Sequence, residues 1–395
     1  MIKYSIPDNW IKYDRLAVLQ HLVNAKAAVI ALSNMPSQRS WAEKMQVVQL
    51  KREIAGTSRI EGADFTEREL DAAMQETPEQ LSTRSQRQAA AAVATYRWIA
   101  KLPDDYPISE ALIYEVHQRI VTGADDDHCT PGELRPRDVN VNFGIPPHRG
   151  AEGGEECAVA FIKLLQAVNS AFREHDPLIQ ALALHYHFAS MHPFLDGNGR
   201  AARALEALLL QRTGLRDTLF IAMSNYYYEE KNQYLGTLAS TRAASHDLTP
   251  FLLFGLKGIE LQCQRLLKEI RTNVQKSLFR NVMYDLFNRL ETPRKRVMAK
   301  RHLEILKLLL DCDSLSVFDI LKATKSSYDN LQNPLKICTR DLIYLLNLGA
   351  IDFKARQDQA SMISIRLEWA TEITDTEFFR RVKKMPHSKM HSFLS

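Results

Sequence analysis

Apolar residues recur every three or four positions through most of this 395-residue chain, which restricts it to a mainly helical fold. Strand-like alternation is rare and is clearest at residues 137–144, where Val and Phe alternate with polar residues before a Gly and a Pro-Pro pair. That stretch predicts a small β-hairpin attached to a helical core. Helices are expected at residues 16–32, 41–56, 87–102, 109–123, 157–175, 178–192, 202–214, 228–241 and about 247–290.

The pattern changes after residue 290. Three short helical segments and two alternating runs with a polar turn between them follow within about 70 residues, an order that resembles a winged helix-turn-helix domain. We therefore predict an N-terminal helical region at 1–105, a central helical core at 106–290, and a winged-helix-like domain with a basic tail at 291–395.

The charge is unevenly distributed. Residues 1–290 carry 33 Lys and Arg against 34 Asp and Glu, whereas residues 291–395 carry 18 against 13. A basic excess confined to the C-terminal part predicts contact with DNA or a protein partner there. On the helix expected at 334–347, Lys336 and Arg340 are the candidate contacts, and basic runs also lie at 294–301 and 380–384.

The five cysteines form no CxxC pair, which argues against a cysteine zinc site and for a reducing compartment. The first residues lack the layout of a signal peptide, and no apolar run approaches the roughly 18 residues of a spanning helix. We therefore expect a cytoplasmic protein without a membrane partner.

Residues 192–203, HPFLDGNGRAAR, concentrate the residue types that bind phosphate. Gly197 and Gly199 let backbone N–H groups approach a ligand where a new helix begins, and a helix N-terminus attracts anions. Arg200 and Arg203 are three residues apart on one helix face, so they can clamp two phosphates of one chain.

The same segment holds a candidate metal ligand and a candidate base. Asp196 supplies the carboxylate oxygen that Mg²⁺ uses when it binds phosphates, and His192 lies across the turn as a general base. Taken singly, each residue also fits a tight interhelical turn with surface arginines and a core histidine. Together they predict phosphoryl or nucleotidyl transfer.

The segment resembles the signature of the Fic family, HPFx[D/E]GNGRxxR, with every specified position filled. HYHF at 185–188, PGELRPRDVNVNFGIPP at 131–147 and SNYYYEEKNQYLGTL at 224–238 are also similar to segments of that family. The resemblance spans about residues 15–290. The whole chain resembles bacterial members that have an N-terminal companion region and a C-terminal winged helix.

This resemblance implies transfer of AMP from Mg·ATP to a Tyr, Thr or Ser hydroxyl of a target protein, or of the chain itself, with release of diphosphate. It assigns His192 as the base and Asp196 as the Mg²⁺ ligand. Val139, Asn140 and Val141 would align the target backbone by strand addition. The residues that it implies for ATP binding are Gly197, Asn198, Gly199, Arg200, Arg203, Asn232 and Tyr234.

The sequence TSRIEG resembles the inhibitory motif [S/T]xxxE[G/N] of the family, on a helix expected at about 41–61. Thr57 and Glu61 share a helix face, and Gly62 is a natural helix stop. A carboxylate at a helix C-terminus is disfavoured by the helix dipole, so Glu61 requires a cationic partner, which the resemblance identifies as Arg203. Such helices are tied to dimerisation in some members, which is compatible with a homodimer.

A second hypothesis remains open at this point. The chain would be a DNA-binding regulator that acts through the C-terminal winged helix, with the Fic core as a nucleotide sensor or as an enzyme that removes AMP. A nucleotide-binding pseudoenzyme is a third alternative, which the filled signature disfavours.

Overall fold

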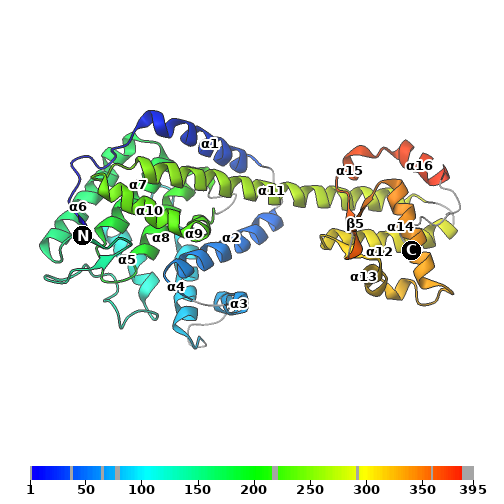
Figure 1. Cartoon of the computed structure of the whole chain (residues 1–395), viewed down its shortest axis with the longest axis horizontal. Helices are drawn as coiled ribbons and strands as arrows, with labels where there is room; N and C mark the ends of the chain where they lie inside the picture. The colour runs from blue at the N-terminus through cyan, green and yellow to red at the C-terminus, as the bar shows by residue number, and fades with distance from the viewer. Residues whose placement is uncertain are drawn as a thin grey trace. The chain divides into compact units, whose positions relative to one another are not determined.

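The computed structural model describes residues 2–35, 39–63, 66–75, 81–215, 221–290, 293–356 and 359–384 (Figure 1). Two compact units make up the chain, Met1–Leu267 and Lys268–Ser395. Both are mainly helical with small sheets, which confirms the predicted fold class. The helices of the first unit are α1 (Arg15–Ser33), α2 (Arg39–Ile60), α3 (Glu67–Gln75), α4 (Arg84–Ile99), α5 (Glu110–Val121), α6 (Glu155–Asn169), α7 (Pro177–Met191), α8 (Asn198–Leu210), α9 (Met223–Glu229), α10 (Lys231–Ala243) and the first part of α11 (Thr249–Asn288).

Helices α7 and α8 form the centre of the first unit. Every residue of α7 from Leu178 to Met191 except Gln180 is buried, and α8 is buried over nearly its whole length. The sequence starts α7 with a side-chain cap, because Asp176 accepts a hydrogen bond from the Leu178 N–H, and with Pro177 at the first helical position. Helices α2, α4 and α5 pack against α8, so the turn between α7 and α8 is held by several neighbours.

Helix α4 begins with a capping box. The Thr83 hydroxyl accepts from the Gln86 N–H at 3.1 Å, and the Gln86 side chain accepts from the Thr83 N–H at 3.1 Å. This cap fixes the direction of the first turn, and Arg84 is its first residue. The position of Arg84 matters for the site described below.

The hairpin is present, but its strands are shorter and lie later than predicted. Strand β2 (Asn142–Phe143) pairs antiparallel with β3 (His148–Arg149), and β1 (Ile2–Lys3) pairs parallel with the other edge of β3. Residues 137–141 precede the ladder because Asp138 has a positive φ of 63°, which turns the chain, and the Val139 carbonyl is held by Arg135.

Helix α1 was not expected to resemble a membrane span, yet by length and mean hydropathy alone it qualifies as one. Core helices of soluble proteins and signal sequences meet the same criterion. Its Val18, Ala25, Val29 and Leu32 are buried against the unit. Lys26 of α1 forms an ion pair with the α7 cap residue Asp176 at 2.6 Å.

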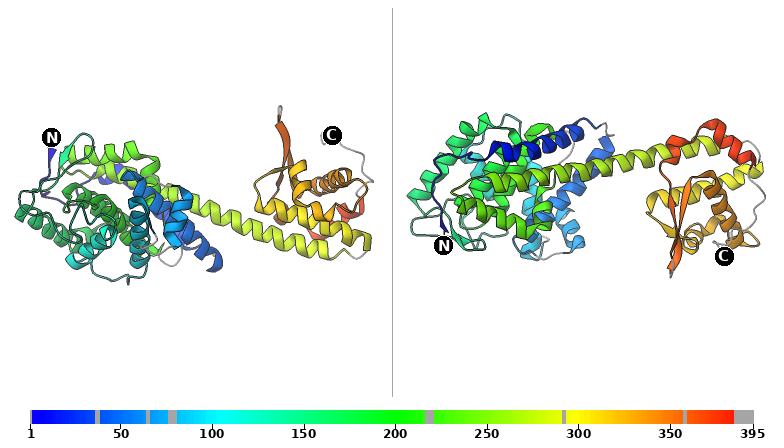
Figure 2. Two further views of the ribbon diagram at one scale, coloured as in Figure 1. Left: turned by 90° about the horizontal axis from the view of Figure 1, so that it is seen from below. Right: turned by 45° about the horizontal axis from the view of Figure 1, so that its top comes forward.

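In the second unit, α12 (Pro293–Asp311), α13 (Val317–Ala323) and α14 (Pro334–Leu348) precede a long hairpin of β5 (Ile351–Arg356) and β6 (Gln359–Ile365), which Figure 2 shows beside these helices. Strand β4 (Leu315–Ser316) completes a sheet of order β4-β6-β5. Helices α15 (Trp369–Glu372) and α16 (Asp375–Lys384) follow. This order matches the elements expected from the sequence, and assignment to the winged-helix class stays a prediction.

The second unit begins earlier than the predicted boundary at residue 291. Phe279, Met283, Leu286 and Phe287 of α11 belong to its hydrophobic core. The division between the units therefore falls within α11, after Leu267, where a helical pattern continues without any change of composition.

One residue of the basic runs predicted to contact DNA, Arg301, is not free to do so. Arg301 is buried, and its Nε donates to Asp341 at 2.7 Å. Lys336 is exposed on α14, and Arg340 is partly exposed beside Asp341. The side chains of residues 294–296 and Lys384 lie outside the described residues.

Candidate active site

The turn between α7 and α8 is closed by Asn198. Its Oδ1 accepts from the Phe194 N–H at 2.9 Å, and its Nδ2 donates to the Phe194 carbonyl at 2.8 Å. Both polar atoms of this buried side chain brace the loop, and phosphate binding by Asn198 stays a prediction. The side chain shapes the loop that presents the helix N-terminus.

The N-terminus of α8 lies where the sequence predicts an anion site. Gly197 is its N-cap residue, with φ at 76°, and the Gly197 N–H donates to Asp196 Oδ1 at 2.5 Å. The first N–H groups of a helix have no acceptor within the helix, so those of Asn198 and Gly199 are directed at a ligand. A Cβ at Gly199 would overlap the Glu61 carboxylate, which shows how closely this carboxylate approaches the α8 backbone.

His192 is held in a left-handed conformation at the end of α7, with φ at 55°. Its Nδ1 lies 3.0 Å from the Ala189 carbonyl, and Arg135 Nε donates to the His192 carbonyl at 2.8 Å. Burial lowers the pKa of His192 to about 4, so the ring is neutral at pH 7. A carbonyl only accepts, so Nδ1 carries the hydrogen and Nε2 keeps the lone pair that a general base needs.

Phe143 of the hairpin stacks on His192, a contact that the sequence analysis did not predict. The ring centroids are 3.9 Å apart and the ring planes differ by 11°. Val139, Asn140 and Val141, the predicted target-binding residues, lie just before the strand. Only Val141 extends the ladder, by accepting from the Gly150 N–H at 3.2 Å. β2 is one edge of this sheet and β1 is the other, because β3 lies between them.

Arg203 and Glu61 form the ion pair that the sequence predicts. Arg203 donates to Glu61 Oε1 at 2.6 Å and, through Nε, to Thr57 Oγ1 at 2.8 Å. Burial opposes ionisation of Glu61, but the charge and the hydrogen bond of Arg203, together with the charge of Arg200, outweigh it and hold the pKa of Glu61 below its ordinary value. Helix α2 ends just before Gly62, which has a φ of 88°, and the Ala63 N–H donates to the Ser58 carbonyl there. This helix end directs Glu61 at α8.

Helix α2 is fixed against α9 by a buried carboxyl group and a close backbone contact. Glu53 accepts hydrogen bonds from the Ser224 N–H at 2.8 Å, from the Ser224 hydroxyl, and from the Tyr96 hydroxyl at 2.8 Å. A Cβ at Gly56 would overlap the backbone of Ser224, so only glycine permits this approach. These contacts determine the position of Glu61 two turns further along the chain.

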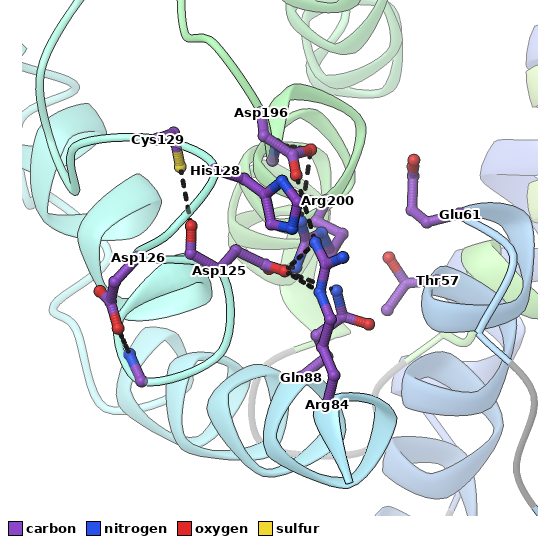
Figure 3. A network of polar contacts seen from close by, with 12 residues as sticks. Thr57, Glu61, Arg84, Gln88, Asp125, Asp126, His128, Cys129, Asp196 and Arg200 are labelled. Atoms are coloured by element: carbon purple, nitrogen blue, oxygen red, sulfur yellow. Dashed lines mark hydrogen bonds and ion pairs between the residues drawn. The ribbon is translucent and has the colours of Figure 1, made fainter.

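Arg200 is held by a residue that the sequence did not single out. Arg200 donates to the buried carboxylate of Asp125 at 2.5 Å. Asp125 also accepts from Arg84 Nε at 2.8 Å and from Gln88 Nε2 at 2.8 Å (Figure 3). Burial raises the pKa of Asp125, but the Arg200 charge and these hydrogen bonds outweigh it and hold that pKa below its usual value. No pattern could have found Asp125, because it lies in an acidic run typical of a solvated loop.

Arg84 is the most accessible guanidinium of this network. Its side chain is 44% exposed, compared with 6% for Arg200 and 2% for Arg203. Its terminal nitrogen lies 3.7 Å from Asp196 Oδ2, and Figure 3 shows it reaching from α4 toward that carboxylate. Two guanidinium groups, Arg84 and Arg200, thus share the buried carboxylate of Asp125, and both also lie within 3.7 Å of the more exposed Asp196 carboxylate beside the α8 N-terminus.

Asp196 fits the chemistry of a magnesium ligand. Its carboxylate is 39% exposed at the turn, beside the N–H groups that face the site. Among the described residues, no three His, Cys, Asp or Glu side chains are grouped as a metal site. Mg²⁺ commonly binds one or two carboxylates and completes its shell with substrate phosphates and water, so a single carboxylate is compatible with it.

The two residues predicted to approach the nucleoside, Tyr234 and Asn232, differ in how deeply they are buried. Tyr234 is buried, its hydroxyl bonds His185 Nε2 at 2.8 Å, and its ring stacks on Tyr227. Tyr234 thus belongs to the packed core, and its approach to the nucleoside stays a prediction. Asn232 is exposed on α10.

Residues 107–210, which include α5, the hairpin, α7 and α8, match the profile of the Fic/DOC family. The centre of the first unit is therefore similar to a Fic domain. Curated relatives include protein adenylyltransferase Fic of Drosophila willistoni, 30% identical over 36% of this chain and 26% of that protein. Another is protein adenylyltransferase fic-1 of Caenorhabditis elegans, 32% identical over 44% of this chain and 31% of that protein. The chain thus spans about a quarter to a third of the length of these relatives.

Solved structures show the same fold. A Fic family protein from Desulfovibrio desulfuricans G20 aligns with a TM-score of 0.57 at 17% identity, covering 92% of this chain and 98% of that chain. Residues 134–508 of Fic-1 from Caenorhabditis elegans align with a TM-score of 0.54 at 21% identity, covering 65% and 74% of the two chains.

Proposed function

We propose that this chain is a protein adenylyltransferase that transfers AMP from ATP to a hydroxyl side chain of a protein. The observation that carries the proposal is the α8 N-terminus, where unbonded N–H groups, Arg200, Arg203 and Asp196 surround one anion position close to His192. The names of the curated relatives support the same reaction class.

In the proposed reaction, the target hydroxyl oxygen forms a bond to the α-phosphorus while the bond from that phosphorus to the bridging oxygen of the β-phosphate breaks. Diphosphate leaves with the electron pair, and the hydroxyl proton moves to His192 Nε2. The α8 N–H groups and the arginines stabilise the charge that develops on the phosphoryl oxygens. Asp196 would hold Mg²⁺, which supplies further charge neutralisation when bound.

We propose that Glu61 inhibits the reaction in the resting state. Its carboxylate pairs with Arg203 and lies against the backbone of Gly199. A phosphate group needs both of these positions, so Glu61 competes with it for the same charge and the same N–H groups. Glu61 is 38% exposed and lies at a helix end, so its displacement requires no opening of the core.

Labelling by ATP carrying a radioactive α-phosphate tests the proposal. We expect Glu61→Gly to label itself or added protein much more strongly than the wild type, and Glu61→Asp to be intermediate. Glu61→Gly/His192→Ala should lose the gain, because removing a general base typically costs about 10²–10⁴-fold in rate. The double variant should still bind ATP, since His192 contacts the attacking hydroxyl. Equal labelling by wild type and Glu61→Gly would refute the inhibition, and undiminished labelling by the double variant would refute the base.

A second proposal concerns DNA contact by the C-terminal unit. The exposed Lys336 on α14 and the basic excess of residues 291–395 favour it, although the burial of Arg301 removes one candidate contact. An electrophoretic shift of duplex DNA by the full chain, reduced by Lys336→Glu, would support it. Absence of a shift at low salt would refute it.

A further inference from the structure

Arg242, in the last turn of α10, is a buried cation without an acidic partner. Arg242 is only 8% exposed, and its Nε has no hydrogen-bond acceptor. The guanidinium forms no ion pair with any described Asp or Glu. Burial lowers the pKa of Arg242 to about 10, which still leaves it charged at pH 7. A buried guanidinium is normally paired, because removing its charge from water is costly. The charge of Arg242 is therefore not compensated by any described carboxylate.

Two neighbouring groups lack partners as well. Both ring nitrogens of His148 are buried without a hydrogen bond, and so is the Tyr4 hydroxyl. Arg242 and His148 meet at Gly144, since a Cβ there would lie 3.3 Å from an Arg242 nitrogen and 3.4 Å from His148 Cδ2. Buried polar groups without partners mark the place of an absent water or ion.

A cavity of about 200 Å³ adjoins Arg242 and Tyr4, whereas His148 is not part of its lining. Strands β1 and β3 of the hairpin sheet supply Lys3 and Arg149 to its lining, and the segment after α10 supplies Ser245. Arg242 and Tyr4 line it too, and no Asp or Glu does. Glu152 lies outside the lining and pairs loosely with Lys3 at 3.7 Å and with Arg149 at 3.6 Å. Arg242 is left as the uncompensated charge.

The cavity is one aromatic ring away from the candidate base. The Arg242 guanidinium lies 5.1 Å from the centre of the Phe143 ring, and the same ring stacks on His192 at 3.9 Å. The guanidinium and the imidazole are therefore within about 9 Å of each other. An extended peptide advances roughly 3.3 Å per residue, so this span corresponds to two or three residues.

We propose that the Arg242 cavity is an oxyanion-binding pocket that receives the carboxylate of an Asp or Glu in the target protein, two or three residues from the modified hydroxyl. Naming the target as the source rests on the function proposed above, because a target strand would pair along the free edge of β2. The pocket would then select acidic target segments. A free phosphate ion shares the oxyanion chemistry and is the alternative source.

Thermal unfolding of the full chain tests the pocket itself. Phosphate and acetate, compared with chloride at equal ionic strength, should raise the Tm of the wild type, because a ligand bound only to the folded state stabilises it. Arg242→Met should lose this response, whereas Arg265→Met, which removes an exposed arginine paired with Glu229, should keep it. An unchanged response in Arg242→Met, or no response in the wild type, would overturn the pocket.

A second variant covers the case in which Arg242→Met does not fold. Ser245→Glu places a carboxylate on the cavity wall, at a residue that already has a positive φ of 52° and is exposed. We expect it to raise the Tm in chloride and to abolish the phosphate response. A lowered Tm with the response retained would argue against the pocket.

Peptide labelling in the Glu61→Gly variant tests the source of the anion. Peptides with one Tyr, and with Glu or Gln at the second or third position on either side, are compared by kcat/KM. We expect about a tenfold or larger preference for a Glu peptide, as for a hydrogen bond between charged groups, and its collapse toward one in Glu61→Gly/Arg242→Met. Equal use of Glu and Gln peptides, with an Arg242-dependent phosphate response, would overturn the target assignment in favour of free phosphate.

The two proposals fail in different ways. If Glu61→Gly labels no peptide and no protein while phosphate still raises the Tm through Arg242, the adenylyltransferase proposal fails, and the target assignment with it, but the oxyanion pocket stands. If labelling is strong and the anion response is absent, the pocket fails and the transferase stands.

Discussion

The basicity of His192 is set by its neighbours. The Ala189 carbonyl fixes the tautomer, Arg135 fixes the backbone, and Phe143 covers one face of the ring. Glu61 raises the pKa of His192 slightly against the larger effect of burial, so removing Glu61 leaves the ring no easier to protonate. The candidate base is thus ready at neutral pH without a carboxylate partner of its own.

We predict a pH profile from this arrangement. For Glu61→Gly, kcat/KM should be flat from about pH 6 to 8 and should fall only as the pH drops toward about 4, where His192 gains a proton and loses its lone pair. Phe143→Ala in the same background uncovers the ring, so the acidic limb should move up toward the ordinary pKa of about 6.5. The check is kcat/KM against pH, and coincident limbs would show that Phe143 does not govern His192.

Arg84 allows a second prediction at this scale. It is the most exposed of the three site guanidiniums, so it is the one able to turn toward outer phosphates. Arg84→Ala should weaken binding of ATP and of inorganic tripolyphosphate to Glu61→Gly by about tenfold, as expected for loss of one charged hydrogen bond. Arg87→Ala removes a charge from the same helix and serves as the control. Calorimetric titration measures both, and equal affinities would exclude Arg84 from the site.

Among the elements, α2 positions Glu61, the residue proposed to inhibit the reaction, against Arg203. Glu53 and Gly56 fix α2 against α9, and the end of the helix directs Glu61 at α8. Burial raises the pKa of Glu53 to about 7, although its hydrogen bonds to Ser224 and Tyr96 favour the charged form. In the unfolded chain a Glu titrates near 4.3. The folded state therefore binds the proton more tightly, and the contribution of Glu53 to stability falls as the pH rises from about 4.5 to 7.

Glu53→Gln should remove this pH dependence. Between pH 5 and pH 8, the wild type should lose on the order of 2 kcal/mol more unfolding free energy than Glu53→Gln, since one pKa unit corresponds to about 1.4 kcal/mol. Urea unfolding of the two proteins at both pH values measures the difference. Parallel pH dependence in both would show that Glu53 is charged throughout.

Sequence periodicity predicted the long helices because each of them buries one face or its whole surface. Such burial requires apolar residues at regular spacing along the sequence. The strands β1, β2 and β3 are two residues long, too short for any alternation to register, so only the presence of a hairpin was foreseen. The nine-residue α3 was missed for a similar reason. In the site, the resemblance predicted the pairing of Glu61 with Arg203, which the structure contains. It gave no sign that Asn198 braces the turn or that Tyr234 packs in the core, because a residue type does not tell which groups its polar atoms contact.

For the whole molecule, the division within α11 determines which fragments are useful. A fragment ending at residue 290 would keep four large apolar side chains of α11 without the core that covers them. Residues 1–267 form the first unit with the entire site.

We predict that the 1–267 fragment is monodisperse and binds ATP in the Glu61→Gly form, whereas the 1–290 fragment aggregates, since exposed apolar patches promote association. Size-exclusion chromatography with nucleotide titration compares them. If the longer fragment were the better behaved one, α11 would belong to the first unit over its full length.

The close approach at Gly56 has a consequence for how sequence changes in this chain are interpreted. A damaging substitution is normally expected to reduce activity, yet any side chain at position 56 would push α2 away from α9 and withdraw Glu61 from Arg203. Such a lesion would lower stability and raise activity together. If Glu61 inhibits as proposed, a packing defect at Gly56, remote from His192, would thus act genetically as a dominant gain of function. Selection on this glycine would then preserve inhibition rather than catalysis.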